Sequence, residues 1–140
     1  MKIVKSINWK SLIVTCAICL LPIFFGVALW DKLPDTIAIH FNFKNEADNF
    51  VSKGFAVFGL PFIMAAIQAF LYVIEDVNLR KKFATKKIKL APKWLVPIVT
   101  VILYTAIIVY SLGWNVDMRK VAVVIVAIAV VYSVKTLGNK

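Results

Sequence analysis

The sequence predicts an all-α integral membrane protein with four transmembrane helices and a small extracellular cap, containing a short strand, between the first two helices. Hydrophobic residues make up 61% of the chain, charged residues only 17%, and the mean hydropathy is +0.85, which is far from the balance of a soluble domain. Several long runs carry no charge, and at a rise of about 1.5 Å per residue such runs cross the hydrocarbon core of a bilayer. Residues 1–140 are therefore expected to form a single membrane domain.

Each long apolar run predicts one span, and the expected spans cover residues 11–30, 55–74, 95–114 and 117–136. The fourth has the shortest uncharged run, and its many Val and Ile residues would suit a buried strand in water. In lipid an unpaired strand leaves every peptide group without a hydrogen-bond partner, so we expect a helix here too. The basic residues at its ends, Arg119, Lys120 and Lys135, are expected to reach toward the two interfaces.

Aromatic and basic residues orient the predicted spans. The tryptophans all lie at the ends of the first and third spans, where indole rings favour the membrane interface: Trp9, Trp30, Trp94 and Trp114. Most of the 17 lysines and arginines fall in the N-terminal segment, in residues 75–93 and at the C-terminus. Because basic residues concentrate on the cytoplasmic side, we expect a multi-pass protein of the cell membrane with both termini inside. This sorting explains the net charge of +10 without direct nucleic-acid binding.

Polar and helix-breaking residues inside the spans have predicted packing roles. Gln68 is expected to point into the bundle and make a packing hydrogen bond. Cys16 and Cys19 are expected to be small packing residues rather than a redox or zinc site, which needs accessible thiolates and further ligands. Three prolines are expected to kink their spans, with the freed carbonyls satisfied by neighbouring helices: Pro22, Pro61 and Pro97.

The segment 31–54 is predicted to form the extracellular cap. Leu33-Pro34-Asp35 indicates a turn, and the alternation that follows predicts a short strand with one apolar face made of Ile37, Ile39, Phe41 and Phe43. Asn45 can adopt the left-handed conformation of a tight turn, and Ser52 is suited to cap the N-terminus of the second span.

Four polar residues of the cap form the candidate site: His40, Asn42, Asp48 and Lys53. The first two share the polar face of the predicted strand, and the other two could close back on them as a hydrogen-bonded, charged cluster. Three roles are open: fixing the shape of the cap, contacting an extracellular peptide, or holding a metal on His40 and Asp48, although the chain has only one histidine. No motif pairs a nucleophile with a base, so we expect neither an enzyme nor a cofactor.

The run LPDTIAIHFNFKNEADNFVSK resembles the signature of the N-terminal half of the SdpI family, bacterial membrane proteins that confer immunity to a secreted peptide toxin. The positions that carry the resemblance are Leu33, Pro34, His40, Asn42, Asp48, Ser52 and Lys53. Asn45 and Ala47 depart from the pattern, because a glycine and a proline are common there, and longer members continue into further spans. The chain is similar to a short member of that family.

The resemblance implies an immunity protein that binds or occludes a secreted antimicrobial peptide toxin at the outer membrane face, with the candidate cap residues as the recognition site. The alternative is a membrane signalling module that sequesters a cytosolic transcriptional repressor through the basic inner loop, 75–93. The residues expected to dock that repressor, or only membrane lipids, are Arg80, Lys81, Lys82, Lys86 and Lys87.

Overall fold

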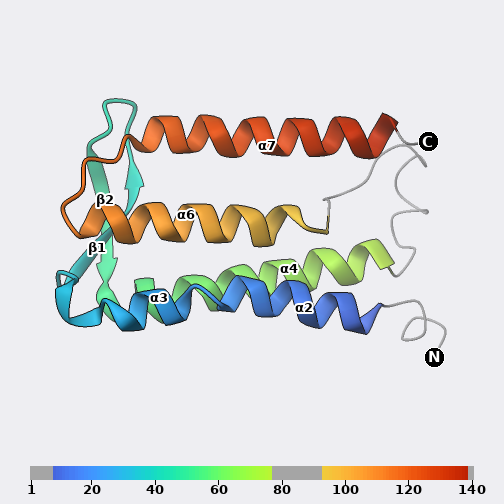
Figure 1. The fold of residues 1–140 in the computed structure, drawn as a ribbon, viewed down its shortest axis with the longest axis horizontal. Helices are drawn as coiled ribbons and strands as arrows, with labels where there is room; N and C mark the ends of the chain where they lie inside the picture. Colours follow the sequence, from blue (N-terminus) through green and yellow to red (C-terminus); the bar gives the residue numbers. More distant parts are fainter. Residues whose placement is uncertain (1–7, 77–92, 139–140) are drawn as a thin grey trace.

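The computed structural model describes residues 8–76 and 93–138 of the chain, so the predicted docking residues of the basic loop, Arg80, Lys81, Lys82, Lys86 and Lys87, lie outside the described residues. The described part is mostly helical, with a two-stranded sheet at one end of a row of roughly parallel helices (Figure 1). Its helices are α2 (Trp9–Leu20), α3 (Ile23–Ala28), α4 (Leu60–Asp76), α6 (Leu95–Ser111) and α7 (Met118–Gly138). Two helical stretches, Trp9–Ala28 and Phe55–Val73, are long and apolar enough to cross a membrane, and Leu95–Ser111 is a shorter apolar helix.

The first predicted span is divided into α2 and α3 around a proline. Asn8 caps the N-terminus of α2, where its Oδ1 accepts a hydrogen bond from the Ser11 N–H at 3.2 Å. Pro22 has no N–H to continue the helical ladder, and α2 ends at Leu20 before α3 begins at Ile23. A kink was predicted at this proline, and the structure divides the helix there.

The second predicted span begins as a π-helix, Phe55–Gly59, which runs directly into α4. The side chain of Ser52 accepts a hydrogen bond from the Phe55 N–H at 3.3 Å, which confirms its expected capping role. π-helical turns are rare and are found mostly as single wide turns inside α-helices. Nothing in the local sequence pattern predicted this one.

Tyr104 of α6 donates to a carbonyl whose α-helical donor position is occupied by a proline. Pro61 cannot donate to the Val57 carbonyl four residues before it, because proline has no N–H. The Tyr104 hydroxyl donates to that carbonyl at 3.1 Å instead. Gly26 of α3 leaves room for the hydroxyl, since a Cβ at this position would collide with it. Three segments of the chain therefore meet at one buried hydrogen bond.

Gln68 plays the same part at the other end of α6. Pro97 cannot donate to the Lys93 carbonyl, and the Gln68 side chain of α4 donates to that oxygen at 2.7 Å. Gln68 is buried, so the expected packing hydrogen bond is confirmed. Cys16 is half-buried, Cys19 is fully buried and neither forms a disulfide, which agrees with their predicted packing role.

The cap is an antiparallel hairpin of β1 (Thr36–Phe41) and β2 (Ala47–Ser52), so the predicted strand is one of two. Ile37 of β1 is fully buried, and Phe41 packs edge-on against Tyr110 of α6 with ring centres 4.8 Å apart. Phe43, in contrast, lies beyond the end of β1 and is 96% exposed. Its predicted place on the packed apolar face is wrong, because the strand ends before reaching it.

The main hydrophobic core lies directly beneath the hairpin, where the hairpin, the π-helix, α6 and the start of α7 meet. Its buried members are Leu33, Ile37, Ala56, Val57, Tyr104, Ile107, Ile108 and Met118. The hairpin is therefore anchored to the helices rather than suspended above them.

The fourth predicted span is helical, as expected, and packs mainly against α6. Valines along one broad side of α7 are more than half exposed, among them Val123, Val126 and Val134. The preceding helix, α6, ends at Ser111, short of the predicted limit of 114, and Gly113 adopts a positive φ of 95° in the connection.

Candidate functional site

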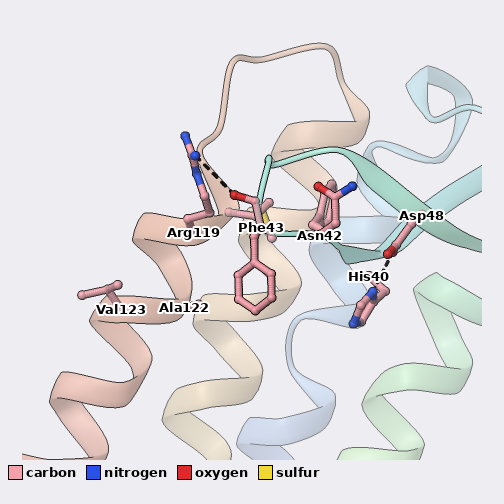
Figure 2. Close-up of a pocket in the computed structure, with 9 residues that line it drawn as sticks. His40, Asn42, Phe43, Asp48, Arg119, Ala122 and Val123 are labelled. Carbon is pink, nitrogen blue, oxygen red and sulfur yellow. Dashed lines mark hydrogen bonds and ion pairs between the residues drawn. The ribbon is translucent and has the colours of Figure 1, made fainter.

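A cleft of about 700 Å³ lies between the hairpin and the first two turns of α7. Its lining residues are His40, Phe41, Asn42, Phe43, Asp48, Met118, Arg119, Ala122 and Val123. Figure 2 shows α7 with Arg119 and Val123 on one side, the pair of His40 and Asp48 on the other, and the ring of Phe43 between them. Apolar side chains dominate this lining, and the charged groups lie on the hairpin and at the first turn of α7.

His40 and Asp48 face each other across the two strands of the hairpin. The Nδ1 of His40 lies 2.6 Å from Oδ1 of Asp48. The register is irregular here, since His40 pairs with Asn49 and Phe41 with Ala47, so the bulge allows Asp48 to reach the histidine. Both side chains are substantially exposed, at 67% and 43%. Such exposed pairs contribute about 0–1 kcal/mol to stability, so this pair is not a main support of the fold. Its exposure leaves it accessible to a ligand.

Asn42 lines the cleft but its polar atoms organise the tip of the hairpin. Its Oδ1 accepts hydrogen bonds from the Lys44 N–H at 2.9 Å and the Glu46 N–H at 3.0 Å. Its Nδ2 donates to the Glu46 carboxylate at 3.1 Å. Asn42 and His40 therefore share the cleft without bonding to each other, because the side-chain hydrogen bonds of Asn42 go to Lys44 and Glu46 in the turn.

Asn45 fastens the hairpin tip to the N-terminus of α7. Its φ of 65° confirms the predicted left-handed conformation. Its Oδ1 accepts a hydrogen bond from the Met118 N–H at 2.8 Å, and its Nδ2 donates to the Val116 carbonyl at 3.2 Å. We call these two bonds the Asn45 clamp. A glycine, common at this position in the resembled family, would take up the same backbone conformation but could not form the clamp.

Arg119 forms the α7 side of the cleft rim and was not among the residues predicted for the site. Its Nε and Nη2 donate to the two carboxylate oxygens of Asp117, at 3.0 and 3.1 Å, and its Nη1 donates to the Phe43 carbonyl at 3.3 Å. Asp117 precedes the first residue of α7, and the hydrogen bond from the guanidinium lowers the pKa of its carboxyl. Asp117 also accepts from the Arg119 N–H at 3.0 Å, as an N-cap does.

Lys53 lies at the base of the hairpin and does not join His40 and Asp48. Its Nζ donates to the carbonyls of Trp30 at 3.0 Å and Leu33 at 3.3 Å, and lies 4.7 Å from the centre of the Trp30 ring. A cation is favourable at carbonyls that end a helical turn, and over an indole face. The predicted cluster therefore separates into a cleft group and a basal lysine that ties the end of the first span to the start of the second.

The described residues of this site offer few metal ligands. Over residues 8–76 and 93–138, no three His, Cys, Asp or Glu side chains gather closely enough to hold a metal ion. His40 and Asp48 would supply two ligands between them, and protein zinc sites use three or four. The geometry favours the two other predicted roles, shaping the cap and contacting an extracellular molecule.

Comparison with known proteins identifies one family match. The family described as "Domain of unknown function (DUF1648)" matches residues 17–65, from the middle of α2 through the hairpin into α4. This domain is found in SdpI-like and other membrane proteins. No curated protein and no solved structure shows a significant match. The match covers His40, Asn42 and Asp48 of the cleft, whereas Arg119 lies outside it.

Proposed function

We propose that the chain is a four-helix protein of the cell membrane that protects a bacterium against a secreted antimicrobial peptide by binding it in the cleft at the outer face. The observation that carries this proposal is the cleft itself, an apolar hollow with His40, Asp48 and Arg119 at its margins. A peptide that inserts into membranes is amphipathic, and such a hollow offers contacts to both of its faces.

The membrane placement is supported by the arrangement of the helices. The start of α2, the end of α4, the start of α6 and the end of α7 lie together at the end away from the hairpin (Figure 1). Four spans with both termini in the cytoplasm require this arrangement. The exposed valines of α7 would face lipid, and its 21 residues reach about 30 Å at the α-helical rise.

The size and lining of the cleft suit part of a peptide rather than a metal or a small polar metabolite. Ligand sites of about 300–1,000 Å³ are typical for molecules or side-chain groups that are mostly buried on binding. The α7 side of the cleft offers apolar contacts from Met118, Ala122 and Val123. The hairpin side offers hydrogen bonds from His40 and Asp48. The residues that carry the resemblance to the SdpI family include three cleft residues, which supports the same kind of ligand.

Survival of sensitive cells that express variants of the full chain tests the proposal. His40→Ala and Asp48→Ala should each weaken protection against the peptide at equal membrane levels, because each removes one polar group from the cleft. Lys44→Ala is the matched control, since Lys44 is an exposed residue of the same hairpin that does not line the cleft. Unchanged protection by both cleft variants, or equal loss in the control, would remove the assignment of the cleft.

A further inference from the structure

The α7 wall of the cleft belongs to the part of the protein that faces the hydrocarbon in the proposed membrane placement. Ala122 and Val123 follow Arg119 by about one helical turn, which places them roughly 5–6 Å deeper along the helix axis. Val123 is 67% exposed although it lines the cleft, so the cleft opens sideways beyond α7. The side of the cleft formed by Ala122 and Val123 offers water no side-chain hydrogen-bond partner, so where it opens into a bilayer it is filled by lipid in preference to water.

Aromatic side chains place the upper part of the cleft at the level of the lipid headgroups. Trp114, in the connection before α7, is 70% exposed, and Phe43 beside the cleft is 96% exposed. Tryptophan in particular is enriched at the boundary between headgroups and hydrocarbon. Arg119 lies beside Phe43 (Figure 2), so in the proposed membrane placement its guanidinium is in the layer of the lipid phosphates.

Arg119 has hydrogen-bonding capacity beyond its contacts with described residues. A guanidinium carries five N–H donors, and the bonds to Asp117 and Phe43 use three of them. The planar fork of arginine matches the oxygens of a phosphate group. The lining contains one acidic side chain, Asp48, and one basic side chain, Arg119, so a headgroup that carries both a phosphate and an ammonium complements it better than a purely anionic one.

We propose that the cleft holds one phospholipid of the outer leaflet, with its phosphate on Arg119, its ammonium toward Asp48 and an acyl chain over Ala122 and Val123. The lipid that fits these charges is a phosphatidylethanolamine. This inference rests on the membrane placement in the proposed function, but not on the peptide. A peptide that binds in the cleft would have to displace this lipid.

Native mass spectrometry of the full chain in detergent tests the proposal with two probes, dioleoyl-phosphatidylethanolamine and dioleoylglycerol, which has the same acyl chains and no phosphate. The wild-type chain should retain one phosphatidylethanolamine and little diacylglycerol. Arg119→Gln removes the charged fork and should weaken retention by about tenfold, the effect of losing a charge-assisted hydrogen bond. Val123→Trp fills the cleft from an exposed position and should abolish retention without disturbing the buried core.

Lys120→Gln is the matched control, because Lys120 is the exposed neighbour of Arg119 and does not line the cleft. Lipid retention in this control should equal that of the wild type. Equal retention of the two lipids by the wild type, or loss in Lys120→Gln as large as in Arg119→Gln, would overturn the proposal. The proposal would also be overturned if the wild type shows a dimer peak, and Val123→Trp removes that peak while lipid adducts persist. A second copy of the chain, rather than a lipid, would then occupy the cleft. A variant that loses lipid retention but still protects cells against the peptide separates this inference from the proposed function. So does a variant that retains the lipid but no longer protects.

Discussion

Replacing Tyr104 by phenylalanine is expected to lower the free energy of unfolding of the helix bundle by about 1–2 kcal/mol. The change removes only the hydroxyl that donates to the Val57 carbonyl, and Pro61 has no N–H to replace it. An unsatisfied buried polar group costs about 1–3 kcal/mol in soluble proteins, whereas interhelical hydrogen bonds in membranes average about 0.6 kcal/mol and reach about 1.7. The two estimates overlap at about 1–1.7 kcal/mol, which lies within the predicted range.

A second substitution tests whether the proline is the cause. Pro61→Ala restores an N–H four residues after Val57, so the backbone itself can supply the missing donor. The cost of Tyr104→Phe should then fall, with a coupling energy of about 0.5–1.5 kcal/mol between the two positions. Such coupling is expected only if the two donors compete for the same oxygen.

The assay is unfolding of the full chain in mixed micelles, followed by circular dichroism as a denaturing detergent is added. Tyr110→Phe is the matched control, because it removes the same atom from the same helix and the Tyr110 hydroxyl has no hydrogen bond to the described residues. The reasoning is refuted if the two tyrosine variants lose equal stability, or if the effects of Tyr104→Phe and Pro61→Ala simply add.

Five further substitutions, at four positions, test other contacts by the same unfolding measurement. Gly26→Ala should cost about 1–3 kcal/mol, because its methyl group collides with the tyrosine hydroxyl, and a free energy within error of wild type would contradict this. Asn45→Ala should destabilise the hairpin by about 2 kcal/mol and Asn45→Gly by less. Both variants lose the clamp, but glycine keeps the left-handed turn. A larger loss of stability in Asn45→Gly than in Asn45→Ala would contradict this explanation. Gln68→Leu should cost about 1 kcal/mol by leaving the Lys93 carbonyl without its donor, and equal or greater stability would count against that role. The wild-type chain should have a larger free energy of unfolding than Asp117→Asn at neutral pH, where the Asp117 carboxylate is charged. This difference should vanish as the pH falls through the lowered pKa of Asp117. A difference that does not change with pH would exclude the ion pair as its source.

Features that depend on local sequence could be predicted. The turn at Asn45, the cap at Ser52 and the proline break at Pro22 each follow from the conformational limits of one residue type. The alternation from Ile37 to Phe41 likewise predicted β1, because one face of the strand had to be buried.

Features that depend on distant partners could not. β2 has no clear alternation, and its residues form a strand because β1 lies beside them. Lys53 was expected near Asp48, but carbonyls at the end of the first span offered it better partners. Arg119 belongs to the site because the hairpin tip contacts the start of α7. Arg119 and Phe43 are more than seventy residues apart in the sequence, so only the three-dimensional structure shows their contact.

The central claim is that the hairpin lies outside the cell membrane, where it can meet a secreted peptide. Labelling of Lys44→Cys with a membrane-impermeant maleimide in intact cells tests this most directly, because residue 44 is exposed at the hairpin tip. The wild-type chain is the control, since Cys16 and Cys19 both lie in α2, within the first proposed span. The account predicts labelling of the variant without permeabilisation. Labelling only after the cells are permeabilised would contradict it.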